Sequence, residues 1–211
     1  PDSQFSDRTQ PSFTEQATYT VSTMSNPANV IKFLHIIENL KRTKRTGWVD
    51  NGIRQPESIG DHMHRMGVMA MLINDPALDR EKCIKMAIVH DLAEAVVGDI
   101  TPHAGVSKEE KFRQERDAIQ GYQTLLDDQI VAQEITQLWQ EYEDAVTPEA
   151  LLVKDLDKFE MIVQAMEYEK SDNKKLQSFF NSTKGKFTHP TVKAWAEALY
   201  AERKQHFGEE E

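Results

Sequence analysis

The stretch Ala87-Ile88-Val89-His90-Asp91-Leu92-Ala93-Glu94 puts one histidine and two acids inside an apolar run that otherwise belongs to a helical core. His90 and Glu94 are four residues apart and therefore share one helix face, whereas Asp91 points about a quarter-turn away. Such polar groups are costly to bury without partners. The cluster could hold a cation, although a buried histidine satisfied by a nearby acid would give the same local pattern.

Helix-start signals recur on both sides of this stretch. Each is a capping residue, in several cases followed by proline or by an acid three positions later, and they stand at Asn26-Pro27, Ser58 to Asp61, Asp79, Ser107 to Glu110, Thr147-Pro148 and Thr188 to Pro190. The helix after Asp79 is predicted to run to about Gly98, and a later one carries an apolar stripe from Val131 to Tyr142. No run alternates with period two for long enough to form a strand. We therefore predict an all-α fold, a compact bundle of about six or seven helices.

The two ends of the chain differ from the middle in composition. Residues 1–26 are rich in Ser, Thr, Gln and Asp and show no apolar periodicity, so they are predicted to be a flexible N-terminal tail. Residues 27–207 form the predicted domain, and residues 208–211 are predicted to be a frayed C-terminus.

Composition excludes several classes of protein. The 211 residues carry a net charge of -10, which argues against a nucleic-acid binder, because such proteins usually present a basic face. The one basic cluster, from Lys41 to Arg45, is either a phosphate-contacting patch or a solvated helix end. No apolar run is long enough for a membrane span, and no secretion signal is present. With Cys83 as the single cysteine, we expect an intracellular protein, in the cytoplasm or the nucleus.

Further polar residues interrupt the neighbouring helices. His62 lies near the start of the preceding helix, and Asp157 lies near the margin of the buried face of a later one, while Asp155 is predicted to point further out. With His90 and Asp91, these residues form a shell of nitrogen and oxygen donors from three helices. Because it contains no thiolate, the shell suits Mn, Fe, Co, Ni, Zn or Mg better than a closed structural zinc site.

Four ordered motifs extend this pattern. They are Pro56-Glu57-Ser58-Ile59-Gly60-Asp61-His62, His90-Asp91-Leu92-Ala93-Glu94, Gly98-Asp99-Ile100-Thr101-Pro102 and Lys154-Asp155-Leu156-Asp157-Lys158. Together they resemble the 5′-deoxynucleotidase branch of the HD-domain phosphohydrolase superfamily, in particular its eukaryotic members and their fungal relatives. The resemblance covers about residues 27–205.

The resemblance implies specific roles for the residues in these motifs. It makes four residues the metal ligands: His62, His90, Asp91 and Asp157. Glu94 matches the catalytic acid of the branch, and Asp99 matches a carboxylate that faces the substrate. Close relatives also hold a second divalent ion, for which the matching groups here are Glu94, Asp99 and the Ile100 carbonyl. The resemblance further implies a homodimer.

One departure from the family pattern concerns the nucleotide-facing arginine. Bacterial members carry an arginine directly before a tryptophan, whereas here Gly47 precedes Trp48 in a predicted loop. We assign the phosphate-binding role to Arg45, with Arg42 and Arg54 as alternatives. Trp48 either fills the core, anchors the loop, or faces the sugar, where a bulky ring near C2′ would reject ribonucleotides by steric clash.

The expected activity is metal-dependent hydrolysis of deoxyribonucleoside 5′-monophosphates to deoxyribonucleosides and phosphate. A divalent ion would polarise the phosphoryl oxygens and lower the pKa of a bound water. One alternative is an enzyme of the same superfamily acting on a dNTP, a cyclic nucleotide or a guanosine alarmone. Another is a non-catalytic helical interaction module in which the metal is structural. Glu94 and Asp99 argue against that module, because a structural site needs no extra carboxylates.

Overall fold

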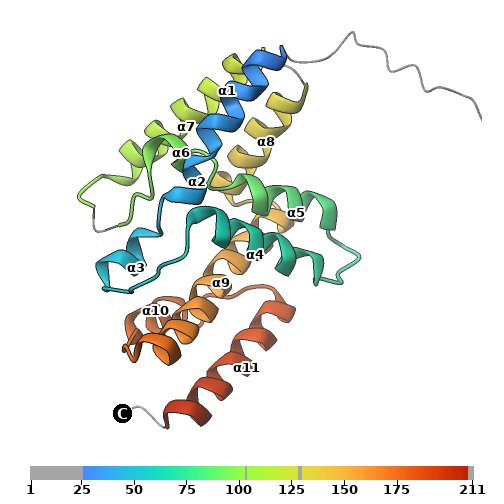
Figure 1. The fold of residues 1–211 in the computed structure, drawn as a ribbon. Coiled ribbons are helices and arrows are strands. Elements are labelled where there is room, and N and C mark those ends of the chain that lie inside the picture. The colour runs from blue at the N-terminus through green and yellow to red at the C-terminus, as the bar shows by residue number, and fades with distance from the viewer. Residues whose placement is uncertain (1–25, 103, 128–129, 209–211) are drawn as a thin grey trace, which may run out of the picture.

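The computed structural model describes residues 26–102, 104–127 and 130–208, and Figure 1 shows them as a bundle of helices. The helices are α1 (Pro27–Ile37), α2 (Asn39–Arg42), α3 (Thr46–Asp50), α4 (Ile59–Met71), α5 (Arg80–Val89), α6 (Glu94–Val97), α7 (Lys108–Leu125), α8 (Ile130–Asp144), α9 (Pro148–Asp172), α10 (Gln177–Thr183) and α11 (Pro190–Phe207). Over these ranges no strand occurs, which confirms the all-α prediction. The seven helices of ten or more residues match the predicted number, whereas α2, α3, α6 and α10 are additional short helices.

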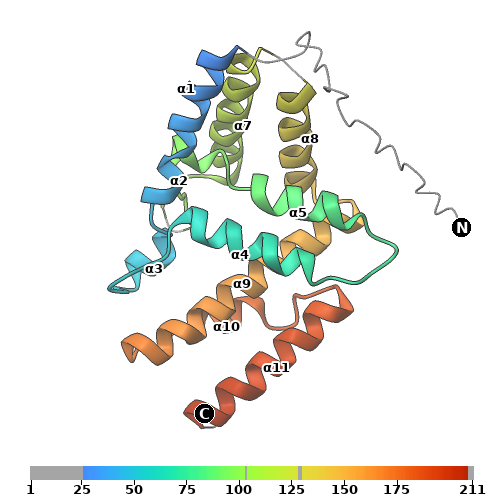
Figure 2. The same ribbon diagram turned by 45° about the vertical axis from the view of Figure 1, so that its right-hand side comes forward.

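Helix α9, with 25 residues, is the longest and lies at the centre of the packing. It contacts α4, α5, α8, α10 and α11. Figures 1 and 2 show α1, α7 and α8 together on one side of the α4–α5 pair, and α10 and α11 on the other. The core between these layers contains Ile59, Met66, Met86, Leu156 and Ile162, none of which has exposed surface. No described helix is both long enough and apolar enough to cross a membrane.

The start of α4 shows how a local signal places a functional side chain. The Ser58 hydroxyl accepts the backbone N–H of Asp61, and the Asp61 carboxylate accepts the backbone N–H of Ser58. This reciprocal capping box confirms the prediction made for these residues. Because it fixes the first turn, His62 points into the bundle and has no exposed surface.

The stretch that carries His90 is not the continuous helix that was predicted. Helix α5 ends at Val89, and residues 90–93 form a tight turn before α6. In this turn the Leu92 N–H donates to Val89 O and the Glu94 N–H donates to Asp91 O, both at 3.0 Å. These i to i+3 bonds wind the chain more tightly than an α-helix. His90 and Glu94 consequently do not share a regular helix face, although both are buried.

Three smaller predictions were also wrong. Trp48 lies in the short helix α3 and not in a loop. Val131, at the first turn of α8, is 62% exposed, because the next residue, Ala132, takes the buried position of that turn. Asp155 is buried, and its Oδ2 accepts the backbone N–H groups of Thr188 and His189. That carboxylate therefore ties α9 to the start of α11.

Some predictions concern residues that the structure does not describe. The N-terminal tail, except Asn26, and the C-terminal end after Gly208 are among them. Within the described part, Asn26 caps α1 by accepting the Ala28 N–H at 2.9 Å.

Candidate active site

A cavity of about 620 Å³ opens between α3, the turn at residues 90–93, α9 and α10. With one exception, the residues predicted to form the site line it: Arg45, Trp48, His90, Asp91, Glu94, Asp99, Ile100 and Asp157. The exception is His62, which has no exposed surface and contacts the same carboxylates from within the bundle. Residues separated by more than 100 positions thus meet at one place.

Both histidine rings are oriented by a bond at Nδ1. Nδ1 of His62 lies 2.6 Å from the Glu160 carboxylate, and Nδ1 of His90 lies 2.9 Å from Ala87 O. A carbonyl or ionised carboxylate oxygen only accepts, so each Nδ1 carries a proton and each Nε2 is the ring nitrogen that faces the site. Neither Nε2 has a hydrogen-bond partner in the structure, although both are buried.

The two free ring nitrogens face two carboxylates. His62 Nε2 lies 3.3 Å from Asp157 Oδ1, and His90 Nε2 lies 3.3 Å from Asp91 Oδ2. Donor atoms of His62, His90 and Asp157 all lie within 4.8 Å of one another. In metalloproteins, a histidine that binds a metal through one ring nitrogen usually donates its other ring N–H to a carboxylate or a carbonyl. The Nε2 atoms and the carboxylate oxygens therefore fit a divalent metal ion.

Arg45 lies between the two carboxylates. Its guanidinium is 3.1 Å from Asp91 Oδ2 and 3.9 Å from Asp157 Oδ1. Its side chain is 18% exposed, whereas those of Arg42 and Arg54 are 76% and 78% exposed and pair with acids on the surface. Among the three candidate arginines, Arg45 alone lines the cavity.

The buried carboxyl groups differ in charge. Burial favours the neutral form of Asp91 and Asp157, but the histidines and Arg45 outweigh it and hold both pKa values below their usual range. Burial, with Asp91 and Asp99 nearby, raises the pKa of Glu94 well above its usual range. Oε2 of Glu94 is buried and has no hydrogen-bond partner in the structure. The cavity thus places two carboxylates with lowered pKa values beside one carboxyl group with a raised pKa.

Asp99 has a structural contact in addition to its place on the cavity wall. Its carboxylate accepts the backbone N–H of Thr46 at 2.5 Å, and its backbone carbonyl accepts the Thr46 hydroxyl at 2.8 Å. Thr46 is the first residue of α3, so Asp99 sits where a helix N-terminus favours negative charge. Asp99 thereby fixes the short helix that carries Trp48.

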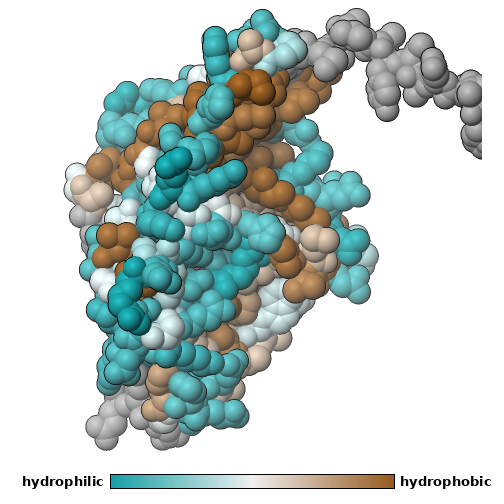
Figure 3. Space-filling view, in the orientation of Figure 1, coloured by the Kyte–Doolittle hydropathy of each residue, from teal (hydrophilic) through white to brown (hydrophobic). Residues whose placement is uncertain are grey.

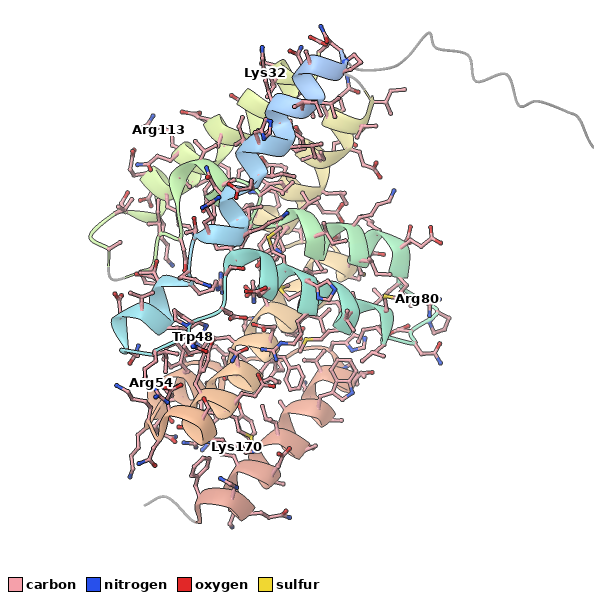
Figure 4. The ribbon with its side chains drawn as sticks, in the orientation of Figure 1. Lys32, Trp48, Arg54, Arg80, Arg113 and Lys170 are labelled. Atoms are coloured by element: carbon pink, nitrogen blue, oxygen red, sulfur yellow. The ribbon has the colours of Figure 1, made fainter. Side chains whose placement is uncertain are left out.

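Trp48 borders the cavity but is mostly covered. It is 2% exposed, and its indole N–H donates to Glu57 at 2.9 Å. Its ring packs edge-on against Tyr168 and at a shallow angle against Phe179. Figure 4 shows it between α3 and the α9–α10 pair, whereas Arg54 lies at the outer edge of the molecule. The burial of Trp48 agrees with the predicted core role, while the predicted role of facing the sugar stays a prediction.

Two residues of the site were missed from the sequence. Glu160 lies three residues after Asp157 on α9, within an apolar segment, and this spacing puts both acids on one face. The Tyr142 hydroxyl donates to Asp157 Oδ2 at 2.9 Å, and its ring packs on His90. Glu160 could have been noticed as an acid among buried residues, whereas Tyr142 is one of several aromatic residues in the α8 stripe.

Comparison with known proteins places the chain in a family. The family model described as HD domain matches residues 37–199. This chain belongs to the HD-domain family. The HD domain here has the histidine, the histidine-aspartate pair and the later aspartate brought together by α4, the turn after α5 and α9.

Individual relatives cover most of the HD domain. A Danio rerio protein named 5′-deoxynucleotidase HDDC2 is 51% identical over 84% of this chain and 90% of its own length. The solved HD domain-containing protein YGK1 is 35% identical, covers 87% of this chain and 90% of its own, and superposes with a TM-score of 0.69. A structure from Magnetospirillum magnetotacticum, described as a predicted metal-dependent phosphohydrolase, is 26% identical over 86% and 94% of the two chains, with a TM-score of 0.66.

The contact between Glu160 and His62 generates a test. We predict that Glu160→Gln weakens divalent-ion binding about 10- to 100-fold, because the amide keeps the shape but loses the charge that orients and polarises the imidazole. Isothermal titration with Mn²⁺ measures the change. Glu167→Gln is the matched control, since Glu167 pairs with the same Arg65 but lies on the surface. Equal affinities for the Glu160 variant and the parent would contradict the role given to Glu160.

Proposed function

We propose that this HD domain hydrolyses deoxyribonucleoside 5′-monophosphates to deoxyribonucleosides and phosphate with the help of a divalent metal ion. The observation that carries the proposal is the pair of unpartnered imidazole nitrogens facing two carboxylates, with a guanidinium and a carboxyl group of raised pKa in the same cavity. The relatives named 5′-deoxynucleotidase, at about half identity over most of the chain, support the choice of substrate.

The proposed metal ligands are His62, His90, Asp91 and Asp157. An ion held there would act as a Lewis acid on the phosphoryl group and make a bound water more acidic. Mn, Co, Mg, Fe, Ni and Zn are all compatible with nitrogen and oxygen donors. A second ion is proposed at Glu94, Asp99 and the Ile100 carbonyl, which line the same cavity.

Side chains of the protein would supply the proton transfer, the neutralisation of phosphate charge and the contacts with the sugar. Glu94, whose raised pKa favours the protonated form when no second ion is bound, would give its proton from a carboxyl oxygen to the 5′-oxygen of the departing nucleoside. Arg45 would neutralise negative charge on the phosphate, as its five N–H donors are arranged to do. Asp99 and Trp48 would border the sugar, where the tryptophan ring restricts the space at C2′.

A panel of phosphate esters tests the proposal. We expect phosphate release from dAMP, dGMP, dCMP, dTMP and dUMP, much less from ribonucleoside monophosphates, and none after chelation until Mn, Co, Mg or Zn is restored. Glu94→Gln should lower the rate at least about 100-fold while circular dichroism shows an unchanged helical fold. A preference for dNTPs, or parental turnover in the Glu94 variant, would contradict the substrate or the role of Glu94.

The three arginines provide a second test with built-in controls. Arg45→Ala should lower kcat for dAMP about 100- to 1,000-fold, the usual effect of removing one donor to a reacting oxyanion. Arg42→Ala and Arg54→Ala should stay within about twofold of the parent, because both side chains lie on the surface. A loss confined to Arg42→Ala or Arg54→Ala would move the phosphate-binding role to that residue.

We also propose that the protein is a homodimer with an intracellular location, in the cytoplasm or the nucleus. Figure 3 shows apolar residues gathered over α1 and continuing across the α4–α5 face. Side chains about half exposed there include Ile31 and Leu34 of α1, Val68 of α4 and Ile88 of α5. The free Cys83 is fully buried and bonded to no other cysteine, which agrees with a reducing compartment.

Sedimentation measures the oligomeric state. We expect a dimer for the parent and a monomer for Val68→Glu, because a charge in an apolar contact is costly to desolvate. Val146→Glu is the control, since Val146 is highly exposed in the link between α8 and α9. A parental monomer would contradict the proposal.

A further inference from the structure

The cavity has a group of uncharged lining residues in addition to the ionised ones. Gly47, Met161, Ser178, Phe179 and Ser182 contribute no charge, and α3 and α10 supply all of them except Met161 of α9. These residues take no part in the proposed metal binding or proton transfer. A phosphate ester of a nucleoside needs such a region, because its base is uncharged and flat.

Phe179 is the aromatic side chain of this region that retains exposed surface. It is half-buried, whereas Trp48 beneath it is almost fully covered. The two ring centroids are 4.5 Å apart with an angle of 33° between the planes. Trp48 is in turn held by Tyr168 and Glu57, so Phe179 is the more exposed ring of a group of three packed aromatic side chains.

The Phe179 ring lies over Gly47 of α3. A Cβ added at position 47 would meet the ring at 3.6 Å, an ordinary van der Waals contact, so the ring faces the side of α3 on which Gly47 lies. On the other side, the Phe179 carbonyl accepts the Ser182 hydroxyl at 2.7 Å, within the turn of α10. The ring that α10 carries is therefore bordered by Trp48 and Gly47 of α3.

The spacing along α3 relates this stack to the phosphate end of the cavity. Arg45 caps α3, and Trp48 follows three residues later. One helical turn advances about 5 Å, which is about the width of a deoxyribose. A phosphate at Arg45 would consequently leave the base of the same nucleotide near the rings carried by α3 and α10.

We propose that Phe179 is the surface on which the nucleobase of the substrate stacks. This inference rests on the proposed nucleotidase function. Stacking on an aromatic ring tolerates any base, because every base has a π face. Phe179 would therefore add affinity for nucleotides with any base. It would favour substrates that carry a base over those that lack one, without discriminating among the bases.

The test compares dAMP with 2-deoxyribose 5-phosphate, which has the same reacting group and sugar but no base. Phe179→Ala should raise KM for dAMP about 5- to 150-fold, the range for loss of one base-aromatic stack, and change kcat little. For 2-deoxyribose 5-phosphate, kcat/KM should stay within about twofold of the parent. Phe179→Leu keeps the contact with Trp48 without a π face and should resemble Phe179→Ala, whereas Phe179→Trp should retain dAMP binding.

Two further comparisons distinguish a loss of base stacking from a general effect of removing a buried ring and from an absence of nucleotidase activity. Phe33→Ala removes another half-buried ring, which packs edge-on against Tyr122 away from the cavity, and should leave both substrates unchanged. Equal losses on both substrates in the Phe179 variants, or no loss on dAMP, would overturn the stacking role. If the parent hydrolyses neither ester, the nucleotidase function fails, and calorimetric binding of dAMP by parent and Phe179→Ala then decides the stacking role alone.

Discussion

Glu160 has no exposed surface, faces Nδ1 of His62 at 2.6 Å, and accepts the Arg65 Nε–H through its second oxygen at 2.8 Å. Burial favours the neutral form of Glu160, but His62 and Arg65 outweigh it and hold its pKa below the usual range. The charge on Glu160 holds a proton of His62 on Nδ1 and orients the ring so that Nε2 points toward Asp157. Because α4 carries His62 and α9 carries Glu160 and Asp157, the packing of these two helices determines the distances between these side chains.

Without a bound ion, the polar atoms of the site lower the stability of the fold. His62 Nε2, His90 Nε2 and Glu94 Oε2 are buried without hydrogen-bond partners, and each such atom costs about 1–3 kcal/mol. The surrounding core offsets this cost with large side chains that have almost no exposed surface, among them Trp139, Leu156 and Ile162. Any cation that binds these atoms in the folded chain alone therefore adds to its stability by mass action.

Much of the fold could be predicted from local sequence because helix starts are decided within four residues. The capping box at Ser58 and the prolines that open α1 and α9 are of this kind. Burial of acids could not be predicted in the same way. Asp155 is buried because backbone N–H groups more than thirty residues away donate to it, and the periodicity of α9 alone does not show that partner. The choice among three arginines likewise depended on how α3 is placed against the turn that carries Asp91.

Arg45 lies between Asp91 and Asp157, so its guanidinium is the positive charge that neutralises these two carboxylates. If Asp91 and Asp157 bound a metal ion, the Arg45 guanidinium would lose these two partners and be free to pair with an anion. An anion that draws the guanidinium away leaves the carboxylates without a positive neighbour and strengthens their attraction for a metal. Thermodynamic linkage would make the two effects equal in size, so the proposed cation and phosphate would bind this cavity with positive cooperativity.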